Sequence, residues 1–381
     1  MSSHLKGYLP RAQLQQLLDH VIAHGYEVHG PRIQDGAVLY QPLHSTAQLP
    51  SGVRDLQAPG RYRMESTGDD RHFSWANGPQ ALKPLLFAPH ETLWQARRET
   101  DGQIEFILPP PVNHKRAVLG VRACDLAALR LQDQHFMEGE YIDPYYAERR
   151  RELLLISVNC SHPAETCFCA STGDGPVASS GFDINLTELD QGYVVESGTE
   201  RGEALLLELS LSPVTQAHEQ ACFQQANAAT DAQTRTLPTI RLHDLLEKRA
   251  DHPQWDDIAE RCLACGNCTQ VCPTCFCHRE GDLASLDGSE SSHHREWDSC
   301  FTAGHGYLAG FQVRPDTKSR YRQWMTHKLD SWQAQFGRSG CVGCGRCTSW
   351  CPAEIDFAAE AHALMTEPAV VGTWQKENDD D

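Results

Sequence analysis

The chain has 381 residues, enough for two or three domains with separate cores, and no apolar stretch in it is long enough to span a bilayer. Its 51 acidic and 33 basic residues give a formal net charge of −18, which argues against nucleic acid or an anionic membrane as the main partner. Residues 1–10 lack the pattern of a signal peptide, and sixteen cysteines in a long chain indicate reduced thiols, so we expect a cytoplasmic protein.

The first expected elements are a helix and a set of short strands. Residues 11–24 predict an amphipathic helix, because leucines recur at helical spacing and Gly25 follows as a stop. Residues 30–115 are typical of short strands and loops separated by proline and glycine. Strands of a small antiparallel sheet are expected at 36–40, 61–65 and 72–75.

Two continuous apolar runs, at 116–121 and 152–158, flank a helical stretch that begins at Asp125. Runs of this kind are typical of parallel strands that are buried on both faces of a sheet. Residues 116–200 therefore predict an α/β arrangement, to which 193–196 would add a strand.

The rest of the chain is richer in helix formers. Residues 203–250 predict mainly helix, with a last helix at 240–249. Few β-branched runs follow. The sequence thus predicts an α+β protein with an α/β domain at 1–250 and a mainly helical domain at 251–381.

Four cysteines follow the two apolar runs. Cys124 and Cys160 each come just after one run, so parallel strands would bring both thiols to the same carboxyl edge, where ligands of α/β sheets bind. Cys167 and Cys169 can both act as ligands only if that stretch is a loop, because such residues point to opposite faces of a strand. The four are candidate ligands of an iron–sulfur centre, with Asp125 as a substitute ligand. The alternative is a set of buried free thiols.

Two cysteine runs in the C-terminal domain repeat one spacing, Cys-x-x-Cys-x-x-Cys-x-x-x-Cys-Pro. The first extends from Cys262 to Pro273 and the second from Cys341 to Pro352. This spacing is that of bacterial ferredoxins, whereas structural zinc sites use two ligand pairs separated by a longer spacer. Two complete copies therefore predict two [4Fe-4S] clusters.

In two-cluster ferredoxins, the fourth cysteine of each run ligates the other cluster. This rule assigns to one cluster Cys262, Cys265, Cys268 and Cys351. It assigns to the other cluster Cys341, Cys344, Cys347 and Cys272. The candidate ligands of a third cluster are then Cys124, Cys160, Cys167 and Cys169.

Three further cysteines, Cys275, Cys277 and Cys300, lie between the runs. Three thiols are one short of a cubane's usual set, so we interpret them as lining the cluster pocket; binding of further metal with an outside ligand is the alternative. Cys222 stands alone in a helical stretch and is interpreted as an ordinary buried thiol. The sequence has no dinucleotide fingerprint and no nucleophile–base set, so no residue is predicted to be catalytic.

Over residues 80–360 the chain resembles the beta subunits of cytoplasmic sulfhydrogenases, which are bidirectional NAD(P)-linked nickel–iron hydrogenases. The iron–sulfur subunit of anaerobic sulfite reductase is similar to this group. The motifs that carry the resemblance are Val121–Leu129, Asp143–Arg150, Asn159–Gly173, Cys272–Cys277, Trp297–Cys300 and Cys341–Cys347.

The resemblance implies an electron relay. A flavoprotein subunit of ferredoxin–NADP reductase type would exchange electrons with NAD(P)H, and this chain would carry them to or from the catalytic nickel–iron subunit. Two alternatives stay open. One is the corresponding subunit of an anaerobic sulfite reductase, with a partner that holds sirohaem. The other is a stand-alone enzyme that uses a site-differentiated iron–sulfur cluster as a Lewis acid.

Overall fold

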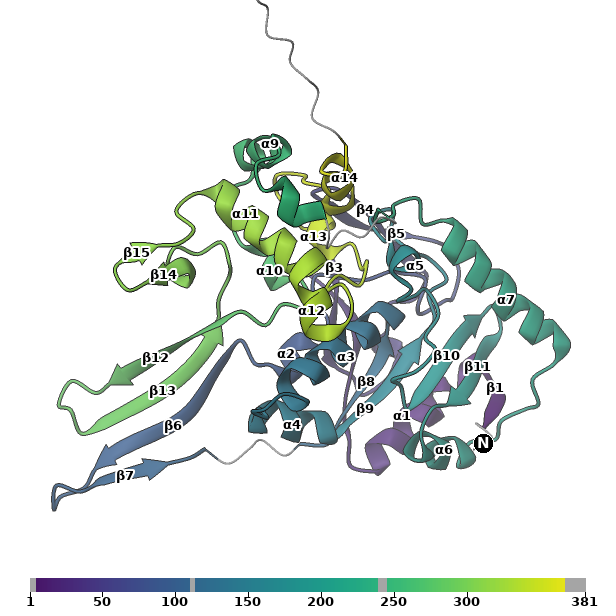
Figure 1. The fold of residues 1–381 in the computed structure, drawn as a ribbon. Helices are drawn as coiled ribbons and strands as arrows, with labels where there is room; N and C mark the ends of the chain where they lie inside the picture. The colour runs from purple at the N-terminus through teal and green to yellow at the C-terminus, as the bar shows by residue number, and fades with distance from the viewer. Residues whose placement is uncertain (1–4, 110–113, 239–244, 367–381) are drawn as a thin grey trace, which may run out of the picture.

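A mixed seven-stranded sheet forms the centre of the computed structural model, which describes residues 5–109, 114–238 and 245–366 (Figure 1). The strand order is β1-β11-β10-β9-β8-β2-β3. The four strands from β10 to β2 run parallel, and antiparallel strands flank them. The strands are β1 (Lys6–Pro10), β2 (Glu27–Gln34), β3 (Ala37–Pro42), β8 (Arg116–Val121), β9 (Leu153–Val158), β10 (Ile184–Leu189) and β11 (Gly192–Ser197).

Helices cover both faces of this sheet, which explains the continuous apolar runs in its central strands. Along β9, Leu154 and Ile156 pack into one buried cluster, while Leu153 and Leu155 pack into another on the opposite face. The first cluster includes α1 (Leu14–Ala23) and α6 (Glu200–Leu207). The second includes α3 (Ala123–Met137) and α4 (Pro144–Arg151).

Most elements expected from the N-terminal half are confirmed. The helix predicted at 11–24 is a short 3-10 turn, Arg11–Gln13, followed by α1, and Gly25 ends it in a left-handed conformation. The apolar runs form β8 and β9, and the strand expected at 193–196 lies within β11. The helical stretch 203–250 contains α6 and α7 (Gln216–Asp231), and the expected helix at 240–249 begins outside the described residues and reaches a 3-10 turn at Glu247–Arg249.

The small antiparallel sheet expected within 30–115 is wrong as a unit. Residues 37–42 form β3 of the large sheet, and β5 (Arg61–Ser66) pairs only with β4 (Val53–Ala58). Residues 72–75 are not a strand. Their backbone groups bond to buried charged side chains instead of to a neighbouring strand, which no local pattern announces.

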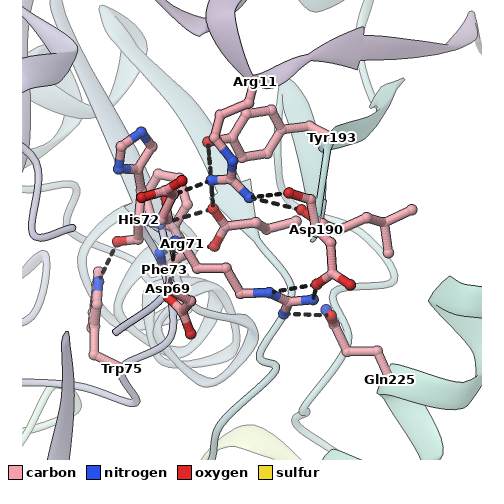
Figure 2. Close-up of polar contacts among 12 residues, drawn as sticks. Arg11, Asp69, Arg71, His72, Phe73, Trp75, Asp190, Tyr193 and Gln225 are labelled. Atoms are coloured by element: carbon pink, nitrogen blue, oxygen red, sulfur yellow. Dashed lines mark hydrogen bonds and ion pairs between the residues drawn. The ribbon is translucent and has the colours of Figure 1, made fainter. Parts of the chain in front are cut away.

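Glu188 of β10 is the anchor of this irregular segment (Figure 2). Its carboxylate, 1% exposed, accepts hydrogen bonds from the backbone N–H groups of His72 and Phe73, each at 2.8 Å, and from Arg11 Nη1 at 2.5 Å. On the other side, the buried guanidinium of Arg122 donates to the carbonyl oxygens of Phe73 and Ala76 at 3.0 and 3.1 Å. The segment is thereby fixed across the carboxyl edge of the sheet.

A second sheet projects from the body as an arm with the order β12-β13-β6-β7 (Figure 1). Its strands are β6 (His90–Arg98), β7 (Ile104–Ile107), β12 (His278–Ala284) and β13 (Glu290–Trp297). Arg295 fixes its base by ion pairs with Glu91 of β6, at 2.7 Å, and with Asp143 at the start of α4. The division expected at residue 250 stays a prediction, and this sheet takes strands from both sides of it.

The α+β class is confirmed, and the C-terminal part is helical except for this hairpin and one short pair of strands, β14 (Tyr307–Leu308) and β15 (Phe311–Gln312). The hairpin escaped prediction because its strands are largely exposed and polar, without apolar alternation. The C-terminal helices are α9 (Gln254–Arg261), α10 (Asn267–Gln270), α11 (Thr317–Thr326), α12 (Trp332–Phe336), α13 (Arg346–Ser349) and α14 (Phe357–Ala363). Short helices elsewhere are α2 (Lys83–Leu86) and α5 (Cys169–Thr172). None of the described helices is long and apolar enough to cross a membrane.

Candidate metal centres

Both cysteine runs have the same local structure, a loop that leads into a short helix. Gly266 and Gly345 precede α10 and α13, and both adopt left-handed backbone angles, with φ of +77° and +73°. A side chain is disfavoured there, which explains glycine at the matching position of each run. The conformation turns the loop so that three thiols can face one small body.

Each run contributes to two cavities, and the fourth cysteine of each lies with the first three of the other. The thiols that line the first cavity include Cys262, Cys265, Cys268 and Cys351. The thiols that line the second are Cys272, Cys341, Cys344 and Cys347. Cys347, Trp324 and Phe357 border both cavities, so the two sites adjoin.

The donor chemistry of both cavities fits an iron–sulfur cubane. Four thiols surround each cavity, and the other lining side chains are mostly apolar, such as Phe301 in the first and Val342 in the second. Burial raises the pKa of Cys268 and Cys347 well above its usual value, because a bare thiolate is poorly solvated there. Such thiols become good ligands once a cluster supplies the compensating positive charge.

The four earlier cysteines lie together at the carboxyl edge of the central sheet. Cys124 lies in the first turn of α3, Cys160 follows β9, Cys167 lies in a turn, and Cys169 begins α5. All four are buried. Cys160 is close enough to Cys167 and Cys169 to interact with them electrostatically, and Cys124 packs with Cys169. The stretch 167–169 is not a strand, which meets the condition for both of its thiols to act as ligands.

Asp125 is engaged elsewhere. Its two carboxylate oxygens accept hydrogen bonds from Arg346 at 2.6 and 3.0 Å, and the side chains are 0% and 1% exposed. Arg346 lies between Cys344 and Cys347, so this ion pair joins the edge of the sheet to the loop of the second run. The position gives Asp125 a clear role other than that of a substitute ligand.

The second run packs tightly on the segment that holds Cys167 and Cys169. Phe168 N donates to Gly343 O at 2.8 Å, and a Cβ on Gly343 would lie 2.5 Å from the backbone nitrogen of Cys169. Asn77, from the irregular segment, donates to Cys344 O at 2.9 Å. Cys344 packs in one buried cluster with Cys124 and Cys169, so the four-cysteine group adjoins the second cavity.

The remaining cysteines separate into different environments. Cys275 is buried beside Cys272, and the two side chains interact by a hydrogen bond. The Sγ atoms of Cys277 and Cys300 are 3.7 Å apart. Cys222 is half-buried in α7, as expected for an isolated thiol.

Comparisons with known proteins agree with this geometry. Residues 261–355 match the family model described as a 4Fe-4S dicluster domain. The chain is also 32% identical over 338 residues to sulfhydrogenase 2 subunit beta of Pyrococcus furiosus, a match that covers 83% of this chain and 96% of that protein.

The chain belongs to the sulfhydrogenase beta-subunit family. The predicted resemblance is confirmed, and so is the general function, that of an iron–sulfur electron-transfer subunit with a 4Fe-4S dicluster domain. No solved structure shows a significant match to the chain.

Sequence reasoning missed three residues of this family member that shape the sites: Arg346, Lys328 and His305. Each acts through partners far away in the sequence or in irregular backbone, so spacing alone gave no signal. The only hint was position, since Arg346 lies inside the second run and His305 follows Cys300 closely.

Lys328 places a buried positive charge beside the second cavity. It lies in a π-helical turn, His327–Ser331, and its Nζ donates to Thr274 Oγ1 at 2.8 Å. Burial by itself lowers the pKa of Lys328, but the thiolates of Cys272 and Cys275 raise it more strongly, so the amine stays protonated. A fixed positive charge favours the reduced state of a nearby cluster.

Replacing Lys328 with methionine should lower the reduction potential of the cluster in the second cavity. Loss of one charge at this distance corresponds to a shift on the order of 100 mV. Redox titration followed by EPR measures the shift. Lys318→Met is a matched control, because that exposed lysine pairs with Asp256 away from the cavities. An unchanged potential in Lys328→Met would show that the amine does not sense the cluster.

Two histidines near Phe276 make stability dependent on pH. His135 stacks on Phe276 with ring centroids 3.5 Å apart, and His327 Nε2 accepts a hydrogen bond from Trp332 Nε1 at 3.1 Å. Burial lowers the pKa of both histidines to about 4. Because an unfolded histidine has a pKa of about 6.5, the unfolded chain binds protons first as pH falls.

The stability contributed by neutral His135 should therefore be complete above pH 6.5 and be lost as pH falls toward 4. We expect a loss of about 1–2 kcal/mol, since partial exposure screens the charged ring. His135→Phe keeps the stacking and should flatten the decline in melting temperature between pH 7 and pH 5. The exposed His24→Gln variant should decline as the parent does.

Proposed function

We propose that this chain relays electrons between a flavin-bearing partner that oxidises NAD(P)H and the catalytic subunit of a nickel–iron hydrogenase. The observation that carries the proposal is the pair of adjoining cysteine-lined cavities, which share Cys347 on their walls. Two such sites in contact suit electron transfer from one centre to the next. The name of the Pyrococcus relative, a sulfhydrogenase subunit, supports the choice of complex.

We assign the cluster ligands by these cavities. The first cubane would be held by Cys262, Cys265, Cys268 and Cys351. The second would be held by Cys341, Cys344, Cys347 and Cys272. Each cluster supplies a one-electron carrier when bound. The chain's own part is to hold the thiolates in place, to exclude water with side chains such as Trp324, and to set the local charge with Lys328.

A third cluster on Cys124, Cys160, Cys167 and Cys169 would extend the relay. This group packs against Cys344, and Cys344 lines the second cavity, which in turn adjoins the first. The three sites would then form a row from the sheet edge to the first cavity. Cys265 is the exposed cysteine among the ligands of the first cavity, so the end of the row at this cavity lies nearest to solvent and to a docked partner.

Anaerobic native purification with metal analysis and mass spectrometry tests the proposal. We expect a flavoprotein and a nickel-containing subunit to copurify with this chain. Sirohaem in place of nickel would support a sulfite reductase complex instead. Oxidation of hydrogen or NADH by the isolated chain would contradict the relay and support a stand-alone enzyme.

The same preparation decides the third cluster. About twelve iron atoms per chain are expected with it and about eight without it. Cys160→Ser should lower the iron content toward eight, while Cys222→Ser, at the isolated thiol, should leave it unchanged. An iron content of about eight in the parent protein would show that the four thiols are free.

A further inference from the structure

Cys277 and Cys300 lie at the root of the hairpin formed by β12 and β13. Cys277 directly precedes β12, and Cys300 follows the end of β13 by three residues. The ladder between the two strands ends at the pair His278 and Trp297, and Asp298 N donates to Cys277 O at 2.9 Å. The backbone thereby holds the two thiols next to each other, apart from the eight cysteines that line the two cavities.

The distance between these thiols fits a single metal ion. Their Sγ atoms are 3.7 Å apart, and two thiolates bound at about 2.3 Å to a tetrahedral ion would lie about 3.8 Å apart. A disulfide would need about 2.05 Å, so the geometry is not that of a bonded pair. A third donor is present, because the ligand atoms of Cys277, Cys300 and His305 all lie within 4.8 Å of one another.

His305 has the environment of a metal-binding imidazole. It lies in a 3-10 turn, Gly304–Gly306, and its Nδ1 hydrogen-bonds to Asp298 Oδ2 at 3.3 Å, which leaves Nε2 for a ligand. Asp298 is itself fixed, since its Oδ1 accepts from Ser299 N at 2.8 Å and from Thr302 Oγ1 at 2.6 Å. A carboxylate that orients an imidazole in this way is typical of zinc sites.

We propose that Cys277, Cys300 and His305 bind one zinc ion, with Asp298 as a positioning residue. Two thiolates and an imidazole match the preference of zinc for sulfur and nitrogen in tetrahedral geometry. Among the described residues three side chains supply ligands, so one position is open to water or to an exogenous thiolate. The ion ties the root of the arm to the turn that carries His305.

Zinc K-edge X-ray absorption and elemental analysis of the anaerobically purified chain, with its iron–sulfur clusters in place, test the site. We expect about one zinc per chain, with two sulfur ligands near 2.3 Å and a nitrogen near 2.0 Å. His305→Asn should bind zinc at least about tenfold more weakly with unchanged iron content, and so should Asp298→Asn. Cys222→Ser is the control and should retain both metals.

Three results would overturn the proposal. The first is a parent protein without zinc in which mass spectrometry shows a bond between Cys277 and Cys300. The second is zinc that persists unchanged in both Cys277→Ser and His305→Asn. The third is loss of iron in His305→Asn, which would assign these ligands to an iron centre. Because His305 lies in a surface turn, its variant remains informative even if Cys277→Ser fails to fold.

Discussion

Replacing Cys351 with serine should remove the cluster of the first run, although Cys351 belongs to the second. The iron content is expected to fall by about four atoms per chain, because a cubane seldom survives without one of its four thiolates. The reason is the exchange of fourth cysteines between the cavities, in which Cys351 lies with Cys262, Cys265 and Cys268. Cys272→Ser should likewise remove the cluster of the second run.

EPR spectra of the reduced variants check this exchange. Cys351→Ser and Cys262→Ser should leave the same residual signal, and Cys272→Ser and Cys341→Ser should leave the other. Adding Lys328→Met identifies the clusters, because it should shift the potential only where the second cluster remains. Spectra that group instead by run, with Cys351→Ser matching Cys341→Ser, would refute the assignment. Cys222→Ser serves as the control with both signals intact.

Replacing Asp125 with leucine should destabilise the fold by about 3–5 kcal/mol, because it leaves Arg346 charged, buried and without its partner. The double variant Asp125→Leu, Arg346→Met should recover most of this loss, since it removes both charges together. Denaturant unfolding, followed by tryptophan fluorescence under anaerobic conditions, measures the difference.

An exposed ion pair gives the matched comparison. Glu290→Gln breaks the pair with Arg97, whose side chain is half-exposed, and should cost less than about 1 kcal/mol. If the double variant were no more stable than Asp125→Leu, the pair would not be the source of the loss. A fall in iron content that the double variant does not restore would instead support Asp125 as a cluster ligand.

Local patterns were enough for the elements whose own residues decide their structure. The continuous apolar strands β8 and β9 and the helix at 11–24 follow from periodicity, and the two cysteine runs follow from spacing. The position of Cys124 and Cys160 at one sheet edge also followed, because parallel neighbours share that edge.

Other features depend on partners that are distant in sequence. Residues 72–75 looked like a strand, yet Glu188 takes their backbone N–H groups. The strands of the arm are polar, and they become strands by pairing β6 with β13. Likewise nothing near Arg346 indicates Asp125, which lies 221 positions away. Tertiary contacts of this kind leave no periodic trace in either partner.

The arm also imposes an order on biosynthesis. Strand β6 ends at Arg98, but its partner β13 begins only at Glu290, so a growing chain exposes one edge of β6 until most of the protein has left the ribosome. An open edge invites pairing with other chains. The charged ends of β6, His90 and Arg97–Arg98, discourage such contacts while the partner is still being made. The polar character that hid the arm from prediction thus protects the nascent chain from aggregation.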